Sequence, residues 1–162
     1  MFAELEKVLD GLMVEDLHRR PAPGANPIGW LCWHTVRSCD RLLGDMVLGE
    51  QLWISAGWHQ KFDRPADFNE TGVGYTDAQV DDLKIPDVKT LLAYEQVVRE
   101  PLLCYIQTLT EHELDREVPA SWKPGTTVPV HSRLAGVLLN LQHIGAAAYV
   151  RGVIKGHGWY GR

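Results

Sequence analysis

The sequence predicts an all-α protein, a four-helix bundle with a long irregular loop between its second and third helices. Apolar residues recur at three- and four-residue spacings over four long segments, the pattern of helices with one buried face. No segment shows the alternation of a half-buried strand, and glycine and proline interrupt the pattern between segments. With 162 residues, 45% of them hydrophobic, the chain is of a size to form one domain, 1–162, around one core.

The first two helices are expected within the first 48 residues. An amphipathic pattern for the first helix is formed by Phe2, Leu5, Val8, Leu9 and Leu12. This helix ends before the sequence RRPAPGANP, whose prolines and glycine break helices. The second helix is expected from Pro27 to about Leu48, because Asn26 suits the N-cap, Pro27 suits the first helical position and Gly49 suits the end.

A segment without clear periodicity follows, from Glu50 to Tyr75. A loop of this length in a small domain is usually functional, and one interpretation is a lid over a pocket. Thr76 then starts a short capped helix, TDAQVDDL. The third long helix is expected from about Asp87 to Leu109, with a kink at Pro101 because proline lacks the amide donor and crowds the preceding turn.

The last third of the chain is expected to hold one short and one long helix. The sequence TEHE at Thr110 is a capping box for a short helix. The sequence PASWKPGTTVP, residues 119–129, is typical of a loop. The fourth long helix is expected from about His131 to Lys155, where Gly156 ends it, and Tyr149 is expected in the core.

Charge and composition narrow the classes of function. The net charge is −5 and the 16 basic residues are scattered, which argues against a nucleic-acid-binding surface. The apolar runs are shorter than the roughly 18 residues of a membrane span, and the acidic N-terminus does not resemble a signal peptide. We therefore expect a cytoplasmic protein with neither nucleic acid nor membrane as partner.

The three cysteines form no CxxC pair and are odd in number, which suits a reducing compartment. Cys32 and Cys39 are seven residues apart and fall near one face of the second helix. Burial raises the pKa of a thiol, so inert core cysteines are the favoured interpretation over a reactive thiol.

Two histidines, His34 and His143, fall deep within two different long helices. A lone helical histidine is usually a core imidazole with a hydrogen-bond partner. Two on different helices of a bundle also permit a shared site, because imidazole is a common neutral ligand of Zn, Ni and Fe. Both interpretations stay open on the residues alone.

Three stretches resemble one known family. They are NPIGWLCWHTVRSCD (26–40), GEQLWISAGWHQKF (49–62) and LQHIGAAAYVRGVIKG (141–156). In this order and spacing the sequence resembles the DinB-like family, which is related to mycothiol-dependent maleylpyruvate isomerase. The resemblance covers nearly the whole chain and implies a four-helix bundle. It also implies a divalent metal ion, Zn, Ni or Fe, and a low-molecular-weight thiol as cosubstrate.

The family's metal ligands are three histidines, and the resemblance places two of them in this chain. His34 matches the ligand of the second helix, and His143 matches one of the last helix. The second ligand of the last helix usually lies four residues away, on the same face. Leu139 and Ala147 occupy those two positions here, and neither binds a metal.

Other residues complete the expected site. His59 of the irregular segment is a candidate third ligand, and Trp33 and Trp58 are expected to shape a pocket. Arg151 is either a surface charge or an anchor for an anionic group, such as the carboxylate of a thiol cofactor. Asp40 is expected to pair with Arg37 rather than to bind a metal.

The expected function is stated as alternatives. The first is a metal-dependent thiol transferase or isomerase with an incomplete histidine site. The second is a metal-free small-molecule-binding or stress-associated bundle without catalysis. A third is a structural or partner-binding bundle. In each of them a homodimer is expected, because such bundles often associate through one helix face.

Overall fold

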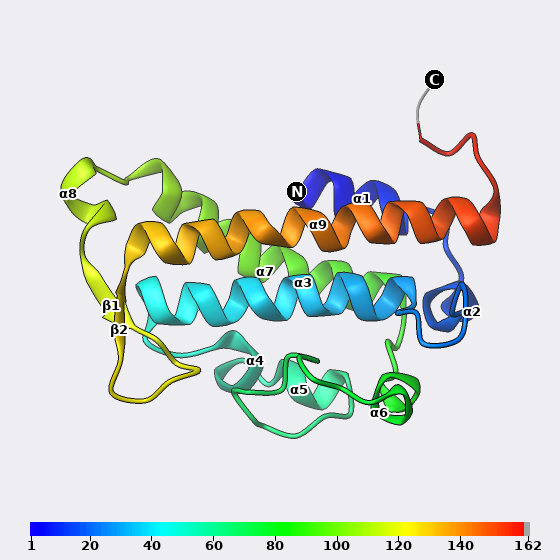
Figure 1. Ribbon diagram of the computed structural model, residues 1–162, viewed down its shortest axis with the longest axis horizontal. Helices are drawn as coiled ribbons and strands as arrows, with labels where there is room; N and C mark the ends of the chain where they lie inside the picture. Colours follow the sequence, from blue (N-terminus) through cyan, green and yellow to red (C-terminus); the bar gives the residue numbers. More distant parts are fainter. Residues whose placement is uncertain (161–162) are drawn as a thin grey trace.

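The computed structural model describes residues 1–160 and shows a bundle built around one central helix (Figure 1). The four principal helices are α1 (Phe2–Leu9), α3 (Ile28–Leu43), α7 (Val88–Gln107) and α9 (Val130–Lys155). α3 packs against both α7 and α9, and α9 lies antiparallel to it along its whole length. The predicted all-α bundle is therefore confirmed.

Short elements connect these helices. They are α2 (Val14–His18), α4 (Leu52–Ser55), α5 (Trp58–Lys61), α6 (Asp77–Asp82), α8 (Glu111–Leu114) and the antiparallel strands β1 (Glu117–Pro119) and β2 (Thr127–Pro129). Two expectations were wrong here. The segment 50–75 contains α4 and α5, which at four residues each are too short to show a helical period. The expected loop at 119–129 begins and ends in strands, which are too short for alternation to be visible.

Helix α3 begins and ends differently from the prediction. Its N-cap is Pro27, and Asn26 does not take that position. At its other end the chain continues into a π-helix, η1 (Gly44–Leu48), and Gly49 ends it in the left-handed region with φ 73°. A Cβ atom at Gly44 would lie 2.8 Å from the Glu50 carbonyl oxygen, so this close return of the chain requires glycine.

The register between α3 and α9 is fixed by four pairs along their length. His34 is opposite His143, Cys39 is opposite Asn140, Leu42 is opposite Gly136, and Asp45 is opposite Arg133. A Cβ atom at Gly136 would lie 3.3 Å from a methyl group of Leu42, so the missing side chain lets the helices approach closely. Polar residues from distant parts of the sequence therefore share one interface.

Helix α7 closes the other side of α3. Asp87 caps it by accepting a hydrogen bond from the Thr90 amide at 2.6 Å. Its buried residues are Leu91, Tyr94, Glu95, Val98 and Leu102. Ile106, near the C-terminal end of this helix, is 38% exposed.

Helix α9 buries one face and exposes the other. Tyr149 was expected in the core, but it is 75% exposed, with Leu138, Leu139 and Val153 also on the exposed side. Within residues 1–160, α9 is the one helix whose length and mean hydropathy of 1.2 would suit a membrane span. This is weak evidence for a span, because the face toward α3 carries buried Arg133 and Asn140.

Candidate functional site

The two helical histidines meet at the interface of α3 and α9. The ring centroids of His34 and His143 are 4.6 Å apart, and the ring planes are nearly perpendicular at 89°. Trp30, one turn before His34, stacks on the His34 ring with centroids 4.8 Å apart and an interplanar angle of 7°. Trp30 also meets the His143 ring at its edge, 6.5 Å away. The structure thus brings both histidines into one aromatic cluster.

A backbone carbonyl orients His34. The His34 Nδ1 atom lies 2.6 Å from the Thr71 carbonyl oxygen, which can only accept a hydrogen bond. Nδ1 therefore carries the proton in the neutral ring, and Nε2 keeps its lone pair. Burial lowers the pKa of His34 to about 4, against the opposing effect of the Thr71 bond. Burial also lowers the pKa of His143, so both rings are neutral at pH 7.

Gly72 holds the Thr71 carbonyl in place. Its φ is +87°, and a Cβ atom there would lie 2.9 Å from the Trp30 Nε1 atom and 3.0 Å from the Trp33 ring. Only glycine fits both this backbone conformation and this space. The sequence analysis missed Thr71 because its contribution is a backbone atom, and Gly72 was the only signal available.

The donor atoms at this cluster do not fit a three-ligand divalent metal site. Within residues 1–160, no group of three or more His, Cys, Asp or Glu side chains surrounds a common point. Leu139 is 60% exposed and faces away from His34. The nearby Cys39 thiol is fully protonated at neutral pH, since burial raises its pKa to about 12. The positive charge of Arg41 also lowers the pKa of His34, and it would repel a metal cation.

His59 and Trp58 lie in another part of the molecule. The His59 ring contacts Trp53, with centroids 6.5 Å apart, and its Nδ1 atom is 3.2 Å from the Arg64 carbonyl oxygen. Trp58 packs on Tyr94 with centroids 5.1 Å apart. Both belong to the aromatic core under the segment 50–75 rather than to the histidine pair.

Trp33 and Arg151 also lie apart from the histidine pair, and each contacts other parts of the bundle. Trp33 is fully buried, and its ring meets Trp53 at 5.9 Å. The Arg151 Nη1 atom donates to the Lys7 and Val8 carbonyl oxygens at 3.1 and 2.6 Å, at the C-terminal end of α1. The structure therefore places Arg151 as a cap of α1, two turns beyond His143 on α9. Arg151 also lines a cavity of about 940 Å³ that neither His34 nor His143 lines.

A buried ion pair connects α3 to the irregular segment. Arg37 and Asp40 are fully buried and paired at 3.0 Å, as predicted. The other guanidinium nitrogens donate to the Glu70 carbonyl oxygen at 2.8 Å and to the Gln51 side chain at 2.9 Å. Burial raises the pKa of Asp40, and the charge of Arg37 opposes this shift. Its satisfied donors and acceptors mark this network as structural.

A second ion pair lies at the other end of the α3–α9 interface. The Arg133 guanidinium pairs with the Asp45 carboxylate and lies over the Trp122 ring, 3.8 Å from its centroid. The Ser121 hydroxyl donates to the same carboxylate at 3.1 Å. The sequence analysis missed this group because its members come from three separate segments and form no motif.

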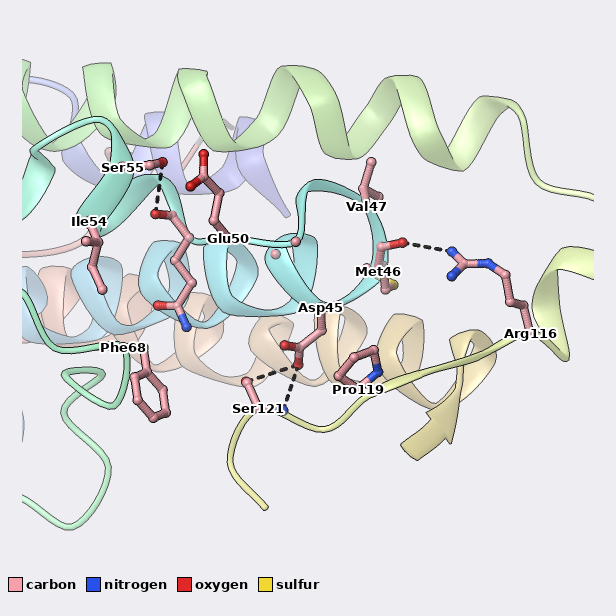
Figure 2. A pocket seen from close by; sticks show the side chains of 13 residues that line it. Asp45, Met46, Val47, Glu50, Ile54, Ser55, Phe68, Arg116, Pro119 and Ser121 are labelled. Carbon is pink, nitrogen blue, oxygen red and sulfur yellow. Dashed lines mark hydrogen bonds between the residues drawn. The ribbon is translucent and has the colours of Figure 1, made fainter. Parts of the chain in front are cut away.

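A cavity of about 570 Å³ opens beside this ion pair (Figure 2). Figure 2 shows Asp45 and Ser121 on one wall, Phe68 and Ile54 on another, and the Arg116 guanidinium bonded to the Met46 carbonyl oxygen at 2.8 Å. Neither His34 nor His143 lines the cavity. It is therefore a separate hollow formed by η1, α4 and the β1–β2 connection.

Comparisons with known proteins identify the family and a structure of the same fold. The family model described as the DinB superfamily matches residues 1–145, a range that contains His34 and His143 and stops before Arg151. Among solved structures, a crystal structure of a conserved protein from Enterococcus faecalis is similar, with a TM-score of 0.79 and 22% identity. The similarity covers 96% of this chain and 91% of that chain, and it shows a common fold. A comparison with curated proteins finds no match.

Proposed function

Because the chain belongs to the DinB superfamily, we propose that it is a small-molecule-binding bundle in which His34 and His143 contact the ligand directly. One observation carries this proposal. Two neutral imidazoles meet edge to face with ring centroids 4.6 Å apart, beside arginines instead of the carboxylates of a metal site. Such rings offer a hydrogen-bond acceptor and a donor to a ligand between α3 and α9.

Binding suits these rings better than acid–base catalysis. A general base works best when its pKa is near the working pH. Burial lowers the pKa of His34 to about 4, so at pH 7 this ring is a weak base. It remains a good acceptor at Nε2, because the Thr71 carbonyl fixes the proton on Nδ1.

A second candidate function is a metal-dependent thiol transferase or isomerase that uses a low-molecular-weight thiol. The Thr71 contact favours it, because metal-bound histidines commonly donate their other N–H to a carbonyl. Zn, Ni or Fe would still need a ligand beyond His34 and His143. The two candidates therefore differ in whether the histidine pair takes up a metal.

Elemental analysis separates the candidates. The protein is purified without tag or chelator, Zn, Ni, Fe and Mn are counted per chain, and Zn and Ni are then titrated into it. We expect far less than one metal per chain and no saturable uptake. Ligand-observed NMR with a library of small anions and thiols should instead find binders that His34→Ala and His143→Ala lose and His112→Ala, on exposed α8, retains.

Two results would contradict the proposal. About one metal per chain, lost in both histidine variants and retained in the His112→Ala control, would support the metal-dependent candidate. Binders that are unaffected by both substitutions would place the ligand elsewhere, and the cavity of Figure 2 is then the site to test.

We also propose a homodimer that forms through the exposed face of α9. This face has no Asp, Glu, Lys or Arg, and its apolar side chains include Leu138, Leu139, Tyr149 and Val153. A Cβ atom at Gly145 or Gly152 would meet nothing within 4 Å, so a second helix has room to approach there. Self-association suits the face, because a two-fold axis would place the same uncharged stripe on both sides.

A cytoplasmic location completes the proposal. Cys32 and Cys39 are free and buried, and burial raises the pKa of each thiol to about 12. Such thiols resist oxidation, and they suit a compartment in which disulfides are rare.

A further inference from the structure

Arg41 lies at the interface of α3 and α9, which also holds the histidine pair, and no carboxylate of the described residues is paired with it. It lies seven residues after His34 on α3, which is two helical turns and nearly the same face. Within residues 1–160, its guanidinium makes neither an ion pair nor a hydrogen bond, and its Nε atom is buried. Buried donors are normally satisfied, so this group calls for an explanation.

The helix register places Arg41 between the two polar ends of the interface. On one side of it, His34 meets His143, and on the other side Asp45 meets Arg133. The charge of Arg41 lowers the pKa of both His34 and Arg133, so it is within electrostatic range of both ends. The position is therefore adjacent to the site of the proposed function.

The neighbouring arginines each have their own carboxylate. Arg37 pairs with Asp40 at 3.0 Å, and Arg133 pairs with Asp45. Both carboxylates are thereby neutralised, and both are also held by further donors, Trp53 for Asp40 and Ser121 for Asp45. One positive charge, that of the partly buried Arg41, is left without a carboxylate among the described residues, and burial lowers the pKa of its guanidinium.

We propose that Arg41 anchors an oxyanion, a carboxylate or phosphate group of a small molecule that also contacts His34 and His143. This inference rests on the proposed function and specifies the chemical class of its ligand. The planar guanidinium presents paired donors that match both kinds of oxyanion. The neutral imidazoles add no competing charge: His34 offers an acceptor at Nε2, and His143 offers one N–H donor and one acceptor.

The test uses inorganic phosphate and succinate as separate probes of the full chain. Each is titrated at pH 7 into protein with ¹⁵N-labelled arginine and histidine, and the Arg41 Nε–Hε signal and the imidazole signals are followed by NMR. We expect saturable shifts with at least one probe. Comparison of the two dissociation constants shows whether phosphate or carboxylate is preferred.

Variants decide whether Arg41 is the anchor. Arg41→Gln is expected to weaken binding at least tenfold, Arg41→Lys to retain part of it, and Arg19→Gln, an exposed arginine without a polar partner within residues 1–160, to change nothing. Arg41→Gln should melt no lower than the natural sequence, because no hydrogen bond or ion pair within residues 1–160 is lost. A clear fall in melting temperature would indicate a structural role and overturn the proposal.

Three further results would decide between the anion-anchor inference and the proposed function. The inference is overturned if neither probe gives a saturable shift, or if Arg41→Gln binds as tightly as the natural sequence. If Arg41→Gln loses binding while His34→Ala and His143→Ala retain it, Arg41 is an anion anchor and the direct histidine contact of the proposed function fails. The two proposals are thus tested separately.

Discussion

Two buried carboxylates differ in how well their charge is compensated: Asp40 has several close donors, and within residues 1–160 Glu95 has none. Asp40 accepts from the Leu52 and Trp53 amides, both at 2.8 Å, in addition to its pair with Arg37. Glu95 on α7 is only 1% exposed, and its nearest cation, Arg99, is 3.5 Å away. Burial raises the pKa of Glu95 to about 7, and the negative charges of Glu6 and Glu100 contribute to the same direction. Asp40 therefore organises the core, while Glu95 is a charge that the fold tolerates poorly.

Replacing Glu95 with glutamine should change how stability depends on pH. The pKa of Glu95 is higher in the folded protein, about 7, than the ordinary 4.5, so the folded state binds more protons between these values. The natural protein should lose stability as pH rises through this window. Glu95→Gln should match it near pH 4.5 and exceed it by up to roughly 3 kcal/mol at pH 8.5.

Urea denaturation at several pH values measures this difference. Glu15→Gln, an exposed position on α2, is the matched control and should follow the natural protein at every pH. A parallel offset of Glu95→Gln, independent of pH, would show that the carboxyl titrates normally in the folded state.

At the scale of elements, the turn at residues 71–72 sets the orientation of the His34 ring. It belongs to the irregular segment, yet it reaches the face of α3 that carries Trp30 and His34. The positive φ of Gly72 and its contact with two tryptophan rings are what direct the preceding carbonyl at His34. A turn outside any helix or strand therefore positions the His34 side chain of α3.

Gly72→Ala should destabilise the protein more than Gly74→Ala. Both glycines have positive φ, +87° and +76°, so both variants bear the cost of roughly 1–2 kcal/mol for a left-handed alanine. A Cβ at Gly72 also clashes with Trp30 and Trp33, whereas one at Gly74 meets nothing within 4 Å. We expect about 3 kcal/mol for Gly72→Ala, with a shift of the His34 Nδ1 proton signal in NMR that Gly74→Ala lacks. Equal losses in the two variants would mean that the turn adapts freely.

At the scale of the whole molecule, the site depends on helices from the two ends of the chain. His34 and Arg41 come from α3, and His143 and Arg133 come from α9, about a hundred residues later. The side of α9 that does not face α3 is apolar and exposed. Association of two copies through that side would leave the polar interface of α3 and α9 within each copy.

The homodimer proposal predicts a melting temperature that depends on concentration. For a dimer that unfolds to monomers, a hundredfold increase in concentration should raise the melting temperature by about 4 °C for a chain of this length. The double variant Leu138→Glu with Leu139→Glu should melt independently of concentration and sediment as a monomer. Ile106→Glu, at an exposed position near the end of α7, is the control and should behave as the natural protein. A natural protein that sediments as a monomer at high concentration would contradict the proposal.

The long helices and the pairing of Arg37 with Asp40 could be predicted because each depends on local spacing. His34 and His143 could be selected because both lie deep in periodic helices. The register that adds Arg41 and Arg133 to their interface could not, since it depends on Gly136 and on contacts between distant segments. The position of Arg151 was also beyond local reasoning, because its partners are carbonyl groups at the other end of the chain.

The attachment of residues 50–75 to α3 has a consequence for amide hydrogen exchange. The Leu52 and Trp53 amide protons are held by the Asp40 carboxylate inside the core. An amide exchanges with deuterium only when its hydrogen bond opens, and water reaches Asp40 only when the bundle separates around α3. These amides should therefore exchange as slowly as those of the helical core, although their segment has little regular structure. A segment held in this way unfolds together with the bundle and does not open as an independent lid.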